Sequence, residues 1–264
     1  AVARQLIRLD VPVMIAASVV VLVLALDGRI GRGEGGLLMA AAVVYTATLV
    51  WLARREAPAQ RDDTPAGSGG VWWRDALAVL AGLALLVLGA RALVGAAVEI
   101  ALALGLSELV IGLTVVAVGT SLPEIAASLV AVRRGQGEMA VGNVVGSNVF
   151  NLLAILGITA VVATGGVPVS AAARSFDLPV MTAVAFACLP VLFTGYRIAR
   201  WEGALFVGYY VAYVAYLLLD TTGHDAAPVM ATVMLGFVVP LTAVTLAVVS
   251  VRAWRARHAP GAGG

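Results

Sequence analysis

The chain has 264 residues, of which 61% are hydrophobic and only 12% are charged. This balance is far from that of a soluble domain and indicates a protein whose solvent is lipid. All 17 basic residues are arginines that nearly cancel 15 acidic residues, so the net charge of +2 gives no reason to expect a nucleic-acid partner. The single cysteine, Cys188, lies in an apolar run, which predicts neither a disulfide framework nor a thiolate metal site.

Hydropathy predicts an all-α integral membrane protein, because about 20 apolar residues suffice to cross the hydrocarbon core as a helix. The eight predicted spans cover residues 11–26, 35–52, 76–104, 108–132, 139–162, 178–194, 203–219 and 229–251. Residues 54–75 are hydrophilic and predict a solvated linker. Residues 220–264 predict an additional helix followed by a polar tail.

The placement of arginine predicts how the chain is oriented. If alternate loops face opposite sides, thirteen arginines lie on the side of both termini and only three lie on the other side. By the positive-inside rule, we expect both termini and the linker 54–75 to be cytoplasmic in a multi-pass protein of the cell membrane. Arg91 falls inside the third span, where we expect it to reach an interface or to pair with a carboxylate such as Glu99.

An internal repeat relates the start of the chain to a later part. LDVPVM at 9–14 recurs as FDLPVM at 176–181, and DGRIGRGEG at 27–35 recurs as TGYRIARWEG at 194–203 with one residue inserted. The copies are five predicted spans apart, an odd number, so they cross the membrane in opposite directions. This is the pattern of an inverted-topology repeat, which secondary transporters use to build a site near the membrane midplane.

The two repeats are unequal in length. Residues 76–219 hold five spans and form a complete second repeat, whereas residues 1–53 hold counterparts of only its last two spans. By symmetry, we expect the first repeat to be incomplete and the chain to lack its start.

Two stripes of polar residues interrupt the apolar runs within residues 108–157. The first stripe consists of Thr120, Glu124 and Ser128. The second stripe consists of Asn143, Ser147 and Asn151. A spacing of four residues places each stripe on one helical face. Because unpaired polar groups are costly in hydrocarbon, we expect the stripes to bind each other or a ligand.

Residues that weaken helical hydrogen bonding accompany both stripes, namely Gly119, Pro123, Gly142 and Gly146. We therefore expect broken helices that line a cavity and expose backbone carbonyls, here near Ala117. Carboxylate, hydroxyl, amide and carbonyl oxygens are hard ligands that suit Ca²⁺ or Na⁺ rather than a soft metal. The alternative is that the polar residues only hydrogen-bond helices together, which explains a buried Glu124 poorly.

GTSLPE at 119–124 and GNVVGSNVFN at 142–151 together resemble the α-repeat of the sodium/calcium exchanger family, within the cation/calcium antiporter superfamily. The resemblance extends from about residue 8 to residue 219. It implies ten core helices in two inverted halves and exchange of Ca²⁺ for Na⁺, or in some branches for H⁺ or with K⁺. It implies no cofactor, and the partners it implies are the bilayer, the transported ions and either a second copy or a chain that carries the missing α-repeat.

The resemblance also assigns ion ligands, with Glu124 as the central carboxylate. The other matching ligands are the backbone carbonyls of Ala117 and Thr120 and the side chains of Ser121, Ser147 and Asn151. Asn143 adds an amide oxygen from the second stripe. The family takes one glutamate from each repeat, whereas this chain supplies only Glu124, and some relatives have aspartate at the position of Asn151.

Antiport by alternating access is the leading hypothesis, and a second one stays open. The second hypothesis is a non-transporting fragment or subunit that packs against a partner supplying the other α-repeat. An intramembrane enzyme is disfavoured because the predicted spans hold no serine, histidine and acid set and no paired aspartates. His224 and His258 lie in a predicted loop and in the tail.

Overall fold

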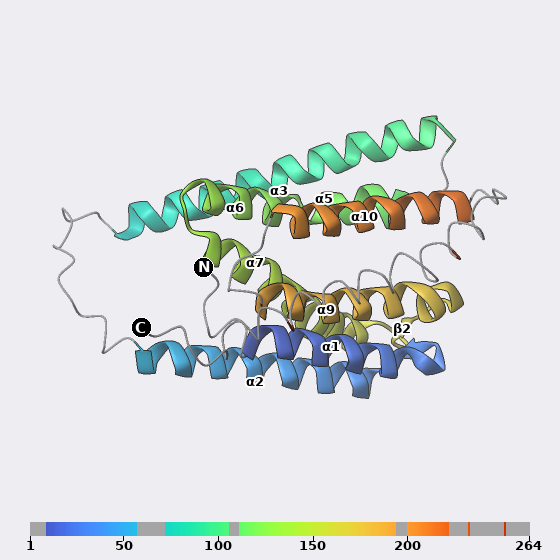
Figure 1. The fold of residues 1–264 in the computed structure, drawn as a ribbon, viewed down its shortest axis with the longest axis horizontal. Coiled ribbons are helices and arrows are strands. Elements are labelled where there is room, and N and C mark those ends of the chain that lie inside the picture. Colours follow the sequence, from blue (N-terminus) through green and yellow to red (C-terminus); the bar gives the residue numbers. More distant parts are fainter. Residues whose placement is uncertain are drawn as a thin grey trace. The chain divides into compact units, whose positions relative to one another are not determined.

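The computed structural model describes residues 9–56, 72–105, 111–193 and 200–221, together with Thr232 and Val251 (Figure 1). Apart from their ends, the predicted linker and the predicted eighth span lie outside these described residues, as does the tail. The described residues are almost entirely helical, which confirms the all-α fold class.

The described elements follow one another in this order: α1 (Val11–Leu24), η2 (Ala25–Asp27), β1 (Arg29–Ile30), α2 (Arg32–Glu56), α3 (Trp72–Ala103), η4 (Gly112–Val116), α5 (Ala117–Thr120), α6 (Leu122–Arg133), α7 (Gly137–Phe150), η5 (Asn151–Ile155), α8 (Leu156–Val162), β2 (Val167–Pro168), η6 (Ala173–Asp177), α9 (Leu178–Phe193) and α10 (Arg200–Thr221). The elements η4, η5 and η6 are π-helical turns, and η2 is a short 3₁₀ helix.

Several of these helices are long and apolar enough to cross a membrane. The four described helices that meet this description by themselves are Arg32–Arg55, Trp73–Ala103, Gly137–Val162 and Arg200–Leu219. Thr114–Thr120 and Leu122–Arg133 add a fifth if they form one span, with a bend of 47° between them. The apolar stretch Val11–Asp27 is shorter, and α9 has 16 residues. The helices therefore confirm a multi-span membrane protein, while the total of eight spans stays a prediction.

The chain divides into two compact units. The α3 unit holds residues 82–140 and 187–264, with most of α3, the helices η4 to α6, and α10. The α2 unit holds residues 4–81 and 141–186, with α1, α2, most of the helix from α7 to α8, and the start of α9. The two polar stripes fall in different units.

In the α2 unit, α1 and α2 form a helical hairpin (Figure 1). Pro12 lies in the first turn of α1. A backbone N–H in this turn has no helical acceptor, so proline, which lacks the N–H, costs the helix no hydrogen bond there. The hydroxyl of Tyr45 on α2 donates to the Asp10 carboxylate just before α1, at 2.9 Å. At the start of α2, the Glu34 carboxylate accepts the backbone N–H of Gly31 at 2.7 Å, which caps the helix.

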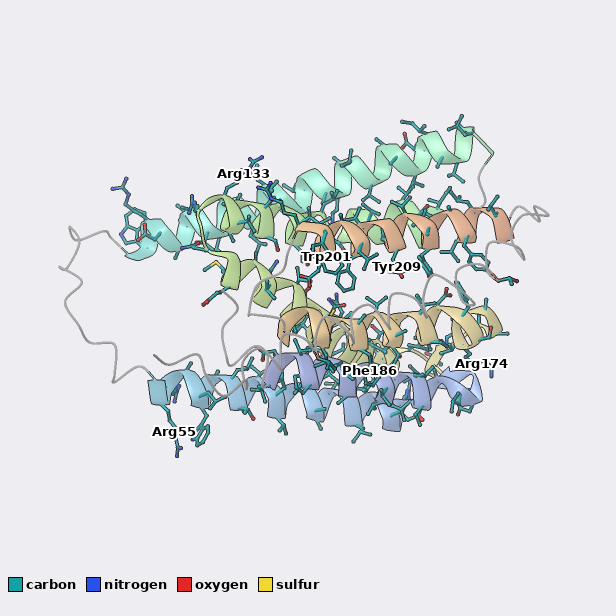
Figure 2. The ribbon with its side chains drawn as sticks, viewed as in Figure 1. Arg55, Arg133, Arg174, Phe186, Trp201 and Tyr209 are labelled. Carbon is teal, nitrogen blue, oxygen red and sulfur yellow. The ribbon has the colours of Figure 1, made fainter. Side chains whose placement is uncertain are left out.

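The turn of this hairpin is joined to the segment between α8 and α9. Arg29 and Ile30 of β1 pair antiparallel with Pro168 and Val167 of β2. The Arg174 guanidinium (Figure 2) reaches η2, just after α1, and donates to the Leu26 carbonyl at 3.0 Å. The helix that carries the second stripe is therefore held to the hairpin at this end of the α2 unit.

In the α3 unit, α3 covers the apolar side of the broken helix. A side chain at Gly119 would collide with Val94 of α3, so the two helices touch there. Beyond this contact, a cavity of about 250 Å³ lies between α3 and the residues Leu122, Pro123 and Ala126. Of the two alternatives expected for Arg91, the pairing with Glu99 is not formed in the described structure, because the two lie eight residues, or about 12 Å, apart along α3.

Candidate cation site

The first half of the candidate site is the break between α5 and α6. The N–H of Ser121 donates to the Val118 carbonyl at 3.1 Å instead of to Ala117, which tightens this turn. Pro123 follows in the first turn of α6 and has no N–H to donate. The tight turn and the proline together explain the bend of 47°.

The break gathers three oxygen atoms. Because Ser121 N–H bonds elsewhere, the Ala117 carbonyl accepts the side-chain hydroxyls of Thr120 at 3.1 Å and Ser121 at 3.3 Å. The carbonyl near Ala117 that the sequence suggested as a ligand thus has two hydroxyl donors on its two lone pairs, so it can bind an ion when one of these hydroxyls turns away. A hydroxyl that donates its proton keeps two lone pairs, so the Thr120 and Ser121 oxygens are arranged to accept a cation.

Glu124 lies one turn beyond Thr120, on the other side of the bend. It belongs to the first turn of α6, where the positive end of the helix dipole favours a carboxylate. Its Oε2 atom is buried. Since Leu122 and Ala126 line the cavity beside α3, helical geometry turns the Thr120 and Glu124 stripe away from α3.

The second half of the candidate site follows α7. The Ser147 hydroxyl donates to the Val144 carbonyl at 3.0 Å, and the Asn148 amide donates to the same carbonyl at 2.8 Å. Both donations orient the polar groups and leave the Ser147 hydroxyl oxygen and the Asn148 amide oxygen as acceptors. The sequence did not identify Val144 as the shared acceptor, although back-bonding to the preceding turn is common for these residue types.

Asn151 opens the π-helical turn η5. The N–H of Leu156 donates to the Asn151 carbonyl, five residues back, as in a π-turn. Val149 and Leu153 are buried on the packed side of this helix, whereas Asn151 is exposed. Asn151 therefore lies on the exposed face of its helix, whereas Asn143 and Ser147 are half-buried.

The predicted site residues divide between the two units. The α3 unit brings together Ala117, Thr120, Ser121 and Glu124 on the broken helix. The α2 unit aligns Asn143, Ser147 and Asn151 on one uninterrupted helix. Within the described residues, no group of three or more histidine, cysteine, aspartate or glutamate side chains could hold a metal ion. The candidate ligands in the described residues are therefore one carboxylate, in the α3 unit, and otherwise neutral oxygens.

Comparison with known proteins gives consistent matches. The family profile described as sodium/calcium exchanger protein matches residues 75–219. CaxA of Alkalimonas amylolytica is 35% identical over 237 residues, which cover 84% of this chain and 70% of CaxA. The sodium/calcium exchanger MaX1 of Methanosarcina acetivorans is 39% identical over 150 residues, which cover 56% of this chain and 42% of MaX1.

A solved structure agrees with these sequence matches. The sodium–calcium exchanger NCX_Mj, soaked with Na⁺ and Sr²⁺, superposes with a TM-score of 0.62 at 29% sequence identity. The match covers 81% of this chain and 66% of NCX_Mj, so the chain spans about two thirds of that protein's length.

Proposed function

Since the chain belongs to the sodium/calcium exchanger family, we propose that it binds and transports cations in an antiporter that exchanges Ca²⁺ for Na⁺ or H⁺. In this proposal Ca²⁺ and the coupling ion are transported substrates rather than cofactors. The chain lies in the cell membrane with both termini on the cytoplasmic side, as its arginine placement favours.

The observation that supports this proposal most strongly is the position of Glu124. A half-buried carboxylate stands in the first turn of a helix, just after a break that gathers the Ala117 carbonyl and two hydroxyls. Hard oxygens of this kind bind Ca²⁺ and Na⁺. At membrane depth, an ionisable side chain with such neighbours favours a transport site over a purely structural role.

We assign the ligands in two groups that follow the two units. The broken helix supplies Glu124, Ser121 and the backbone carbonyls of Ala117 and Thr120. The second stripe supplies Asn143, Ser147 and Asn151. A single carboxylate leaves a bound divalent ion with net positive charge, which is costly in a low dielectric. In this proposal a second carboxylate completes the site, supplied by the other α-repeat or by a second copy of this chain in the proteoliposome.

Antiport follows if Ca²⁺ and the coupling ion occupy overlapping ligands. Occupancy by one ion then excludes the other. Access to the site therefore switches back to the first side of the membrane only when the competing ion is bound. The gradient of one ion thereby drives the other in the opposite direction. Alternating access around a site built from broken helices is the mechanism that inverted repeats support in secondary transporters.

The experiment is uptake of radiolabelled Ca²⁺ by proteoliposomes with an outward Na⁺ gradient and, separately, an outward H⁺ gradient. We expect uptake with one of the two gradients, which identifies the coupling ion, and its loss in Glu124→Gln. Glu138→Gln is the matched control, because Glu138 is an exposed carboxylate at the start of α7 and outside both stripes. Undiminished uptake by folded Glu124→Gln contradicts the ligand assignment.

A second function is a cation-binding subunit that needs a partner with the other α-repeat. It is favoured by the single carboxylate among the described candidate ligands, which leaves a bound divalent ion with excess positive charge. Thermal stabilisation of the purified protein by Ca²⁺, without uptake in either gradient, supports this function. Uptake by the chain alone excludes it.

A further inference from the structure

The helix that carries the second stripe crosses α2 at two glycines, Gly35 and Gly157, which we call the glycine crossing. A Cβ atom at Gly35 would lie 2.8 Å from the Gly157 carbonyl oxygen and 2.8 Å from the Ala160 Cβ atom. A Cβ atom at Gly157 would lie 3.0 Å from the Gly35 carbonyl oxygen and 3.0 Å from the Met39 nitrogen. The two backbones are thus in direct contact, with no room for a methyl group.

Buried apolar residues surround the glycine crossing. Leu38 on α2 is 1% exposed, and Ala160 and Leu153 on the other helix are 0% and 5% exposed. α2 contacts both η5 and α8. Close-packed interiors resist displacement. The crossing therefore fixes where the helix Gly137–Val162 stands along its own axis relative to α2, and how it is rotated about that axis.

A short covalent and hydrogen-bonded path joins the crossing to the second stripe. Leu156 precedes Gly157, and its N–H donates to the Asn151 carbonyl. Asn151 lies six residues before Gly157 on the same uninterrupted helix, about 9 Å along its axis. A displacement of the helix at Gly157 therefore moves Asn151 with it.

We infer that the glycine crossing positions the Asn151 ligand, so that Gly35 and Gly157 are positioning residues for cation binding although neither touches the ion. This inference rests on the proposed function and extends it to residues outside both stripes. A methyl group at Gly35 needs its contacts to open from 2.8 Å to at least 3.4 Å, a shift of about 0.6 Å. Protein oxygens bind Ca²⁺ at about 2.3–2.6 Å, so such a shift exceeds the tolerance of the ligand sphere.

The neighbouring glycine supplies a matched control. Gly36 is exposed on the same helix, and a Cβ atom there would meet nothing within 4 Å. Replacing either glycine by alanine raises helix propensity by the same amount, so only the collision differs between the two variants.

The test compares Gly35→Ala and Gly157→Ala with Gly36→Ala in two assays, Ca²⁺-dependent thermal stabilisation of the purified chain and the KM of Ca²⁺ uptake. We expect Gly35→Ala and Gly157→Ala to weaken Ca²⁺ binding and raise KM about tenfold, with a smaller change in maximal rate. Gly36→Ala is expected to match wild type. Adding Ala160→Gly to Gly35→Ala removes the Ala160 Cβ atom, one of the three atoms that lie within 3.0 Å of the new methyl group, and is expected to restore part of the affinity.

Outcomes in these assays separate the inference from the proposed function. If Gly35→Ala and Gly157→Ala bind Ca²⁺ as wild type does, while Glu124→Gln does not, the positioning role is wrong and the proposed function stands. If wild type neither binds nor transports Ca²⁺, both are wrong. Gly157→Ala has the milder collision and decides the question if Gly35→Ala does not fold.

Discussion

The two helices that carry the polar stripes differ in construction. The helix with Glu124 bends by 47° at Ser121, whereas the helix with Asn151 runs without a break over Gly137–Val162. The first helix touches α3 and buries only Gly119 of α5 and Ala131 of α6. The second helix buries a longer series of residues, which includes Val145, Val149 and Leu153. The charged ligand therefore stands beside a break, and the neutral ligands stand on a helix held by close packing.

Proline explains this difference better than glycine does. Glycine accompanies both stripes, and we expected Gly142 and Gly146 to break the second helix as well. That expectation is wrong, since a glycine costs a helix only about 1 kcal/mol and keeps its N–H. Pro123 lacks the N–H and clashes with the preceding turn, so only the first helix breaks.

The largest effect that follows from this comparison is the contrast between the two kinds of ligand. We expect Glu124→Gln to abolish Ca²⁺ uptake, because it removes the one carboxylate of the described ligands. Asn151→Ala removes a neutral oxygen and is expected to raise the KM of Ca²⁺ uptake about tenfold. Equal effects of the two substitutions on uptake contradict a central role for the carboxylate.

The next effect tests whether the break is needed. Pro123→Ala restores an N–H that can donate to the preceding turn, so we expect a straighter helix with the Ala117 oxygen cluster dispersed. The maximal rate of uptake is expected to fall about tenfold while the protein stays folded and monodisperse. An unchanged rate means that the tight turn at Ser121 is sufficient to maintain the break.

A smaller effect concerns the hydroxyls at the break. Thr120→Val and Ser121→Ala each remove a donor to the Ala117 carbonyl, at a cost of about 1 kcal/mol per hydrogen bond. We expect each variant to raise the KM for Ca²⁺ about fivefold. If the two hydroxyls act as one cluster, the double variant deviates from the product of the single effects.

The smallest effect lies outside both stripes. Glu34→Ala removes the cap on the Gly31 N–H at the start of α2 and is expected to lower the free energy of unfolding by about 1 kcal/mol. Its KM for Ca²⁺ is expected to equal that of wild type because, although Glu34 directly precedes Gly35, the contacts of Gly35 with Gly157 and Ala160 do not involve the Glu34 side chain. A tenfold rise in KM would mean that end-capping of α2 also positions the ligands.

The sequence predicted the membrane-length helices and the spacing of both stripes because hydropathy and helical periodicity are local properties. Pro123 also predicted the break correctly. The glycine crossing was not predictable, since Gly35 and Gly157 are distant in sequence and nothing local marks two glycines as partners. The shared acceptors Ala117 and Val144 were likewise hidden, because hydrogen bonds to backbone carbonyls depend on the turn geometry rather than on residue type.

The most direct test of the central claim is Ca²⁺ binding to the purified chain in competition with Na⁺, measured for wild type, Glu124→Gln and Glu138→Gln. We predict that wild type and Glu138→Gln bind Ca²⁺, that Na⁺ displaces it, and that Glu124→Gln does not bind it. Displaceable Ca²⁺ binding by folded Glu124→Gln, equal to that of wild type, would contradict the claim that the carboxylate beside the break binds the transported ion.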